Sequence, residues 1–478
     1  MKTILQVLSE DEKNQVHTRS LDILANTGVR VDTAIGRNLL KEAGAQVNED
    51  THIVRFPRDL VEESLRITTK DFTLGARRPG WDLKMNAGNF TLLADGEGMF
   101  VVDAETGERR SSTAKDWLNA THLIDALDEI GIYWSMVERG DEPPIPTPGE
   151  MVKHYSRIFS NFSKHVQDGS PGAEFSPWLL EILQVIFGDK ETIRNTHPFS
   201  FLHCPQSPLV IDQQYMDAYL ALLGWDIPVA IMPMPLMGGT APGSLIATII
   251  LGNCEVLATL CMIQSGAPGT PIIYAPVFAI SNLRNGSYSA GAIESGLTGA
   301  ASTEMARYYG LPVEASGGGT SQFMPGIQAS YERSLNALLP VLSWPDILVG
   351  PGLMGGSTHL SFEQLLIDVE VYKMGIRTHQ GIATDNQHWL DEVIQQVGPA
   401  GNFMGQPSTI KNMRSGEWYI SDFGSQGSYE EWHNSGKPDL IQEARERIDQ
   451  ILSTHKPLPL SEEMERELDQ IYKRAQEI

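Results

Sequence analysis

Cysteine is scarce in this sequence, which has three among 478 residues, at positions 204, 254 and 261. The number is odd, and no two of them form a C-x-x-C pair. This pattern excludes a disulfide framework and is typical of a reduced, cytoplasmic chain with buried thiols. A thiolate zinc site needs two or three soft ligands that converge on the metal, and these spacings supply too few. We therefore predict a cytoplasmic protein that binds no metal itself.

Positive charge is scarce as well, with 36 Lys and Arg against 60 Asp and Glu and a formal net charge of −24 at pH 7. No basic run rises above this background, so we expect neither nucleic acid nor an anionic membrane as a partner. The longest apolar stretch, residues 244–266, is interrupted by Asn253, Glu255 and Gln264. It favours a buried helix over a membrane span. The first fifteen residues hold an apolar run too short for a signal-peptide core.

Two common catalytic or cofactor-binding signatures find no support. No G-x-S-x-G elbow occurs, so a nucleophilic serine has no motif behind it. Gly350, Gly352 and Gly355 match G-x-G-x-x-G, but late in the chain and without a ribose-binding acid on a second strand. Turn geometry is therefore the favoured interpretation of these glycines.

The sequence does contain short apolar segments that alternate with helical ones after residue 112. Seven of them begin at residues 132, 164, 199, 228, 271, 312 and 346, which leaves room for a helix between neighbours. This alternation indicates a parallel sheet, and an eighth segment near residue 380 would complete an α/β protein with a (β/α)8 TIM-type barrel. We expect the barrel over 116–398, an N-terminal α+β extension over 1–115, and a C-terminal extension over 399–478 with helices at 438–454 and 461–476.

The active site of such a barrel is expected where the strands end at their carboxyl side. Glu138 and Glu314 could act there as paired carboxylates, which leaves a lyase or hydrolase open as an alternative. Aromatic rings near the later strand ends could instead hold a quaternary ammonium group, each ring contributing on the order of 0.5–2 kcal/mol. The candidates are Tyr274, Phe278, Phe323 and Trp344. The competing interpretation places these rings in the core.

The segment PVEASGGGTSQFMPG, residues 312–326, ends an apolar strand in three glycines, Gly317, Gly318 and Gly319. Composition allows a phosphate-binding nest, a hinge or a tight turn, and the turn is favoured. If the barrel is correct, this glycine run lies at a strand end and faces the mouth.

Four longer stretches together resemble a known family. They are YWSMVERGD (133–141), PMPLMGGTAPGSLIATIILGNCEVLA (233–258), GLPVEASGGGTS…QASYE (310–332) and DNQHWLDEVIQQVGPAGNFMGQPSTIKNMRSGEW (385–418). In their order and spread the chain resembles the trimethylamine methyltransferase family, and within it the members that lack pyrrolysine. The resemblance implies a barrel that moves a methyl group from an amine to the Co(I) form of a corrinoid (cobalamin) carried by a separate corrinoid protein.

The resemblance also implies a substrate class. The pyrrolysine of the trimethylamine enzymes falls within Gly317–Gly319, where this sequence has no such residue, and we expect the vacated volume to admit a bulkier substrate or the corrinoid. The non-pyrrolysine relatives look like quaternary-amine demethylases. Glycine betaine, giving dimethylglycine, is the expected substrate, with proline betaine, carnitine or another methylamine as alternatives. A non-catalytic betaine-binding protein is the alternative of another class.

A site for that reaction must hold one N-methyl carbon in line with cobalt, orient a carboxylate and exclude water. The four aromatic candidates would form the cage. The side chains expected to recognise the carboxylate or otherwise bind substrate are His203, Arg284, Gln322, His359 and Glu314. We also expect the corrinoid protein to dock over the glycine-rich rim, and the two C-terminal helices to join subunits of a homo-oligomer.

Overall fold

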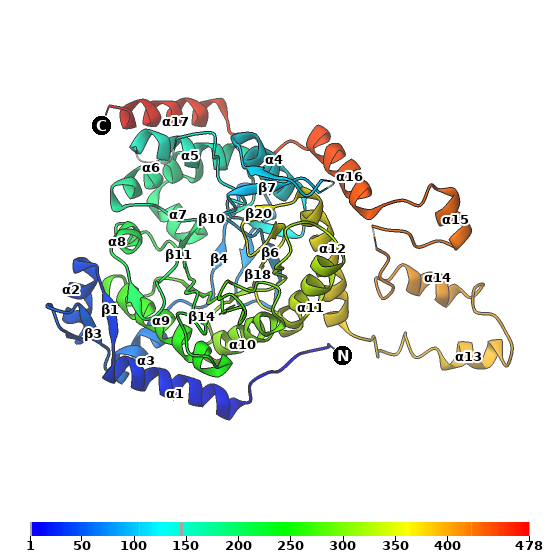
Figure 1. Ribbon diagram of the computed structural model, residues 1–478, viewed down its shortest axis with the longest axis horizontal. Coiled ribbons are helices and arrows are strands. Elements are labelled where there is room, and N and C mark those ends of the chain that lie inside the picture. The colour runs from blue at the N-terminus through cyan, green and yellow to red at the C-terminus, as the bar shows by residue number, and fades with distance from the viewer. Residues whose placement is uncertain (1, 105, 144–146, 422, 478) are drawn as a thin grey trace.

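Eight parallel strands form a barrel in the computed structural model, which describes residues 2–104, 106–143, 147–421 and 423–477 (Figure 1). In chain order they are β6 (Thr91–Leu93), β9 (Ile130–Tyr133), β10 (His165–Asp168), β11 (Phe199–His203), β13 (Val229–Ile231), β15 (Ile272–Tyr274), β17 (Glu314–Ser316) and β18 (Ile347–Val349). Neighbours along the sheet run β15-β13-β11-β10-β9-β6-β18-β17. A parallel bridge between Tyr274 and Val313 joins the two ends, with Tyr274 N donating to Pro312 O at 2.9 Å. The predicted barrel fold is confirmed.

Helices follow the strands and form the outer layer. They are α4 (Ala114–Ala126), α5 (Pro148–Asn161), α6 (Ser176–Phe187), α8 (Gln214–Leu220), α9 (Leu245–Gly266), α10 (Ile293–Tyr309), α11 (Ile327–Ser343) and α12 (Phe362–Gln380). The apolar stretch predicted to be a buried helix is α9. It packs against three helices of the N-terminal region, α1 (Glu10–Asn26), α2 (Ala34–Glu42) and α3 (Arg58–Ile67). It is the one described helix long and apolar enough to span a membrane, and 78% of its most apolar window is buried inside the protein.

The eighth strand is not where the sequence suggested. Residues near Gln380 end α12, and β6 completes the barrel between β9 and β18. β6 lies inside the range 1–115 that was expected to form a separate extension, because its short apolar segment resembled the antiparallel pieces around it. The division of the chain at residues 115 and 398 otherwise stays a prediction.

The N-terminal region covers one side of the barrel and one of its ends. α1 (Glu10–Asn26), α2 (Ala34–Glu42) and α3 (Arg58–Ile67) flank a small sheet of β1 (Val29–Val31), β2 (Gln46–Val47), β3 (Ile53–Arg55) and β12 (Val210–Ile211). The hairpin β4 (Thr73–Leu74)–β5 (Leu83–Lys84) carries Leu74 and Met85, which pack among the side chains inside the barrel. Asn86 N donates to Asp346 just before β18, and Gly75 O bonds to His165 Nδ1 at the start of β10. These two bonds hold the hairpin across the amino end of the barrel, which it closes.

The opposite, carboxyl end carries the elaborations. β7 (Phe100–Val102) and β8 (Arg109–Ser111) follow β6, and β19 (Leu353–Met354) and β20 (His359–Leu360) follow β18; together they form one four-stranded sheet. β14 (Leu236–Met237) and β16 (Ala279–Ile280) pair after β13 and β15. These additions build a wall around the mouth of the barrel.

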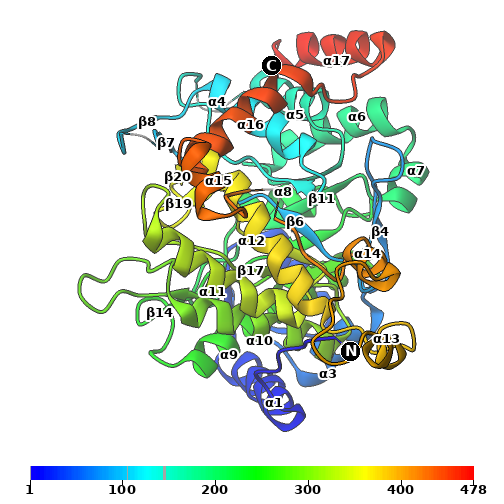
Figure 2. The same ribbon diagram turned by 90° about the vertical axis from the view of Figure 1, so that its right-hand side faces the viewer.

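The C-terminal region contains both predicted helices, α16 (Leu440–Thr454) and α17 (Glu462–Ala475). Their apolar stripes pack within the chain, α16 against α12 and α4, and α17 against α5 and α6 (Figures 1 and 2). They are therefore not the free subunit-joining surface that the sequence suggested, and assembly into a homo-oligomer stays a prediction. Between α12 and α16 the chain runs away from the barrel through α13 (Asp391–Val397), α14 (Pro407–Met413) and α15 (Tyr429–Asn434), none of which buries a residue.

Candidate active site

Strand alternation decides which predicted site residues enter the barrel. In β11 and just after it, Leu202 and Cys204 pack in the interior cluster, while Phe199 and Phe201 pack in the helix-facing core. His203 shares the outward face, is fully buried, and neither ring nitrogen has a hydrogen-bond partner among the described residues. Burial lowers its pKa to about 3. His203 therefore cannot receive a carboxylate in the mouth, and that expectation is wrong.

Tyr274 and Phe278 are also turned toward the helices. The Tyr274 hydroxyl donates to Asn253 Oδ1 of α9 at 3.0 Å, and its ring lies 6.2 Å from that of Tyr309. Phe278 is buried against Gly252 of the same helix. Inward and outward positions alternate along β15, and Ile273 and Ala275 occupy the inward ones. Neither ring belongs to a cage in the mouth; both are core, as the competing interpretation held.

Trp344 lies at the wrong end of the barrel. It ends α11 just before β18, stacks on His379 with centroids 3.9 Å apart, and donates from Nε1 to Gly88 O at 2.9 Å. Because α11 ends where β18 begins, Trp344 is at the amino side of the strands. It too is removed from the predicted cage.

Three of the predicted residues do meet at the rim. The rings of Phe323 and His359 are in edge contact with centroids 5.1 Å apart, and His359 also stacks on Phe100 at 5.1 Å. Burial, with Arg109 nearby, lowers the pKa of His359. Gln322 donates from Nε2 to Gln328 Oε1 at 2.7 Å. Arg284 is exposed in the loop after β16, on a separate part of the rim.

Four mouth residues were missed. Asp95 and Glu97 follow β6, Trp134 follows β9, and Tyr288 lies in the loop that carries Arg284. Tyr288 contacts the backbone of Gly356 after β18, and Trp134 lies against Gly96. Asp95 accepts from the Ser357 hydroxyl at 2.6 Å. The D-G-E triplet after residues 91–93 would have been the signal, had that segment been recognised as a barrel strand.

Both missed carboxyls have raised pKa values, and Glu97 also lies among other carboxylates in a cavity. Burial raises the pKa of Asp95 to about 6, against the hydrogen bond from Ser357. Glu97 is exposed toward the mouth, yet the barrel wall around it desolvates the carboxyl, and with Asp168 and Glu138 nearby this raises its pKa to about 7, while a hydrogen bond from Trp134 opposes the shift. Charges that repel one another in this way favour a cationic ligand, since a cation between them relieves both the repulsion and the desolvation.

A cavity of about 560 Å³ opens beside these residues, at the carboxyl ends of β6, β9 and β10. His154 and Asp168 line it with Nε2 and Oδ2 2.9 Å apart, and Arg139 donates to His154 Nδ1 at 3.1 Å. Arg139 also pairs with Glu142 at 3.2 Å. The cationic side chain of this cavity is thus already engaged by acceptors of the protein.

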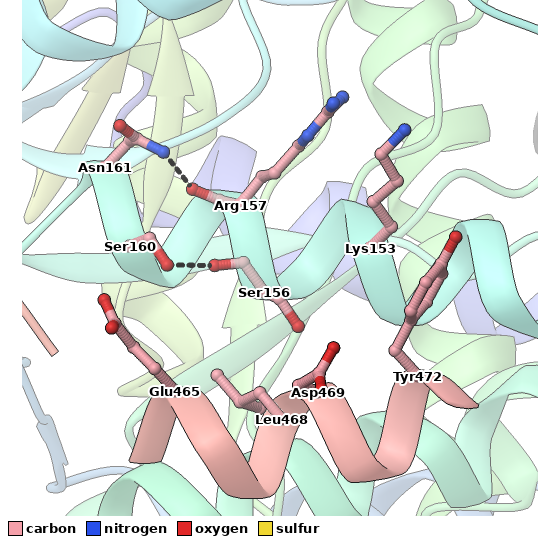
Figure 3. A pocket seen from close by; sticks show the side chains of 9 residues that line it. All are labelled: Lys153, Ser156, Arg157, Ser160, Asn161, Glu465, Leu468, Asp469 and Tyr472. Carbon is pink, nitrogen blue, oxygen red and sulfur yellow. Dashed lines mark hydrogen bonds between the residues drawn. The ribbon is translucent and has the colours of Figure 1, made fainter. Parts of the chain in front are cut away.

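A second cavity, of about 310 Å³, lies on the outside of the barrel between α5 and α17 (Figure 3). Two of its polar side chains bond back to α5, Asn161 to Arg157 O at 2.8 Å and Ser160 to Ser156 O at 2.8 Å. Because it is remote from the strand ends, we place the active site in the mouth and not here.

Glu314 is the predicted site residue that points into the barrel. It is fully buried, and Gln167 Nε2 donates to its Oε2 at 2.9 Å, while its Oε1 has no partner among the described residues. Burial raises its pKa to about 7. The neighbouring interior side chains are mostly apolar, among them Ala230, Met232, Ile273 and Ala275.

The glycine run is packed, not vacant. A Cβ at Gly317 would meet Pro340, and one at Gly319 would meet Ala290 O at 2.6 Å. Gly318 has φ +77°, and a Cβ there would press on the Tyr372 hydroxyl. The expectation that these glycines leave room for substrate is therefore wrong for their own side-chain positions, because α11, α12 and the loop before α10 fill that space.

A buried ion pair holds this loop and the next. Arg333 Nη1 lies 2.6 Å from Asp368 Oδ2 and donates to Gly318 O at 2.8 Å and to Gly350 O at 3.2 Å. Gly352 N donates to the same Asp368 oxygen at 2.8 Å. One Arg–Asp pair from α11 and α12 thus fixes the glycine-rich ends of β17 and β18 at the mouth.

Comparison with known proteins agrees with this architecture. A solved structure, the monomethylamine methyltransferase of Methanosarcina barkeri, superposes with a TM-score of 0.54 at 15% identity and covers 100% of this chain and 88% of its own. At that identity the match shows the fold alone.

Sequence relatives extend over the whole chain. Trimethylamine methyltransferase MttB of Desulfitobacterium hafniense (strain DSM 10664 / DCB-2) is 29% identical, over 95% of this chain and 91% of the relative. Glycine betaine methyltransferase of Desulfitobacterium hafniense (strain Y51) is 28% identical, over 97% and 95%. The profile of trimethylamine methyltransferase (MTTB) matches residues 2–478. The chain therefore belongs to the trimethylamine methyltransferase (MTTB) family of methyltransferases.

Proposed function

We propose that this protein transfers a methyl group from a quaternary amine to the Co(I) corrinoid of a separate corrinoid protein, with glycine betaine as the substrate and dimethylglycine as the product. One observation carries the proposal. The mouth combines aromatic rings, Trp134 and Tyr288, with the carboxyls of Asp95 and Glu97, whose pKa values are raised by desolvation. Rings and carboxyls together attract a quaternary ammonium group.

The chemistry asks little acid–base work of this chain. A quaternary nitrogen leaves as a neutral tertiary amine without taking up a proton, so no general acid is needed at that atom. The corrinoid would supply the nucleophile, and the resident side chains bind the amine, orient one methyl carbon outward and exclude water. Trp134 and Tyr288 would enclose the methyl groups, while Asp95 and Glu97 balance the positive charge.

The rim suits a large, flat partner. The loops after β17 and β18 present glycines, and Arg333 and Asp368 hold them rigidly from below. Small residues permit close approach of the corrinoid protein over the mouth. Gln322 lies on this rim and Arg284 on the separate part formed by the loop after β16, and we propose them as the donors to the betaine carboxylate. Phe323, beside His359, would shield one side of the opening.

The decisive experiment combines the purified protein, a corrinoid protein reduced to Co(I), and glycine betaine, and follows the corrinoid absorbance as the methyl group is transferred. Proline betaine, carnitine and trimethylamine are tested in parallel. We expect transfer from a quaternary amine and none from trimethylamine. Absence of transfer with every quaternary amine would refute the proposal.

Matched variants locate the site. Trp134→Ala should raise the KM for the amine about tenfold, because one ring contributes on the order of 1–2 kcal/mol to holding the cation. Trp389→Ala is the control, since Trp389 is 63% exposed on the C-terminal segment away from the barrel. Equal effects of the two variants would argue against a cage at Trp134. A far larger loss of activity in Glu314→Gln than in Trp134→Ala would favour the carboxylate-based lyase or hydrolase.

A further inference from the structure

A continuous hydrogen-bond chain crosses the interior of the barrel. His165 Nδ1 lies 2.9 Å from Gly75 O, and His165 Nε2 lies 2.9 Å from Ser200 Oγ. Ser200 Oγ is 3.1 Å from Gln167 Oε1, and Gln167 Nε2 is 2.9 Å from Glu314 Oε2. All four side chains are fully buried, so every proton in the chain can be counted.

The protonation state of His165 determines where the other hydrogens of the chain lie. Burial lowers the pKa of His165 to about 4, so the ring is neutral and carries a single N–H. A carbonyl oxygen can only accept, and Gly75 O therefore fixes that hydrogen on Nδ1. Nε2 is then an acceptor, and the Ser200 hydroxyl is its donor. The one hydroxyl hydrogen of Ser200 is thereby used.

The amide of Gln167 must adapt to this. With Nε2 toward Glu314, its Oε1 would compete with His165 for the single hydrogen of Ser200, which leaves one buried acceptor without a donor. Turning the amide by 180° exchanges two groups of nearly equal shape, so that the NH₂ donates to Ser200 and the oxygen faces Glu314. Two facing oxygens form a hydrogen bond only when one is protonated. With His165 neutral, the fully satisfied chain therefore requires a protonated Glu314.

The surroundings of Glu314 agree with this. Burial raises its pKa, the hydrogen bond with Gln167 Nε2 as donor lowers it by less, and no cationic side chain of the described residues is among the causes. On β11 the nearby titratable group is Cys204, whose thiol pKa is raised to about 12 by burial and by the charges of Glu97 and Glu314. On β18 and β15 the neighbours are Ile347 and Ala275, which carry no charge.

We propose that the empty protein holds Glu314 as a neutral carboxylic acid, and that a quaternary ammonium group entering the mouth drives it to ionise, so that cation binding releases one proton. This rests on the proposed function only in that the ligand is a cation. The site is reachable, since Ser316, two residues beyond Glu314 on the same face, and Cys204 are partly exposed at the mouth. Two residues of strand place the Cα atoms of Ser316 and Glu314 about 7 Å apart, so a cation at that level lies close enough to act on the carboxyl.

The proton balance is simple. Glu314 gives its proton to solvent through the mouth, and the cation supplies the compensating charge. The Gln167 amide then turns its NH₂ toward the new carboxylate, and the Ser200 hydrogen turns to Gln167 Oε1. His165 Nε2 loses its donor, and that penalty keeps Glu314 protonated until a cation arrives.

Calorimetric titration with tetramethylammonium and with glycine betaine, in two buffers of different ionisation enthalpy at pH 6, measures the protons released. We expect the wild type to release about one proton more per bound cation than Glu314→Gln, because Asp95 and Glu97, whose pKa values are also raised, are present in both proteins. Below pH 7 the affinity of the wild type should increase more steeply with increasing pH than that of the variant, by about one further factor of ten per pH unit, because Glu314 expels one further proton. Equal proton release and equal slopes in the two proteins would overturn the inference.

Infrared spectroscopy provides the second readout. The difference spectrum between the empty wild type and empty Glu314→Gln should contain a protonated-carboxyl band, and this band should disappear when the cation binds. Ser200→Ala removes the donor to His165 and with it the reason for the amide orientation, so the carboxyl band should titrate at lower pH. A band that is missing in the empty wild type, or unmoved in Ser200→Ala, would refute the inference. Methyl transfer without proton release refutes this inference alone, and proton release without methyl transfer refutes the proposed function alone.

Discussion

Replacing Arg333 by methionine tests whether the buried ion pair fixes the mouth. The Arg333 and Asp368 side chains are 1% and 2% exposed, and the guanidinium also bonds to the carbonyls of Gly318, Gly350 and Leu353. Removing one partner of a buried pair costs about 3–5 kcal/mol, because the other charge stays buried without compensation. With an unfolding entropy of about 2 cal/mol/K per residue, this corresponds to a Tm lower by roughly 3–5 °C for a chain of this size.

Scanning calorimetry of Arg333→Met, Asp368→Leu and the double variant measures this. The double variant should recover most of the loss, since two apolar side chains of similar volume leave no uncompensated charge. The pKa of Asp368 is already raised to about 6 by burial, against the effect of Arg333. Without Arg333 it rises further, so the Tm deficit of the single variant should be larger at pH 8 than at pH 5.5. Arg474→Met, which breaks an exposed pair with Glu181, should change Tm by less than about 1 °C. A single variant as stable as that control would refute the reasoning.

Three further outcomes are expected. Glu314→Gln should be more stable than the wild type at pH 8 and of similar stability at pH 4. The pKa of Glu314 in the folded protein is about 7, above its value in the unfolded chain, so the wild-type carboxyl lowers the free energy of unfolding as pH rises. Urea denaturation at both pH values measures this difference. Gly318→Ala should cost clearly more than Gly286→Ala in the same assay, since both have positive φ but only Gly318 has Tyr372 in the way. Tyr274→Phe should lose about 1 kcal/mol of stability with unchanged KM, because the Tyr274 hydroxyl donates to Asn253 outside the barrel. A change in KM would return Tyr274 to the site.

Local sequence patterns were sufficient for much of the fold. Seven of the eight barrel strands, the buried helix α9 and the two C-terminal helices follow from apolar periodicity and punctuation, which are properties of neighbouring residues. The eighth strand failed because β6 is three residues long and sits between antiparallel pieces. A strand that short carries no periodicity of its own, and only its pairing with β9 and β18 identifies it.

The site was predicted less well, for a reason of geometry. Sequence position predicted His203, Tyr274 and Glu314 near the carboxyl ends of strands, although Glu314 begins β17, and the face that each side chain takes depends on the register of the closed sheet. One residue of offset decides between the barrel interior and the helix layer. Glu314 falls inside and the other two fall outside. Asp95 and Glu97 could not be proposed at all while β6 was assigned elsewhere.

The sequence by itself determined the fold class, the order of strand–helix units and the family resemblance, because these are written in local periodicity and in contiguous motifs. Tertiary structure alone decided what the mouth contains. Trp134, Tyr288, Asp95 and Glu97 come from three separate parts of the chain and meet only when the barrel closes. Closure of the barrel also filled the space around the glycine run. It joined one set of interior side chains from different strands into a single chain of hydrogen bonds: His165, Ser200, Gln167 and Glu314.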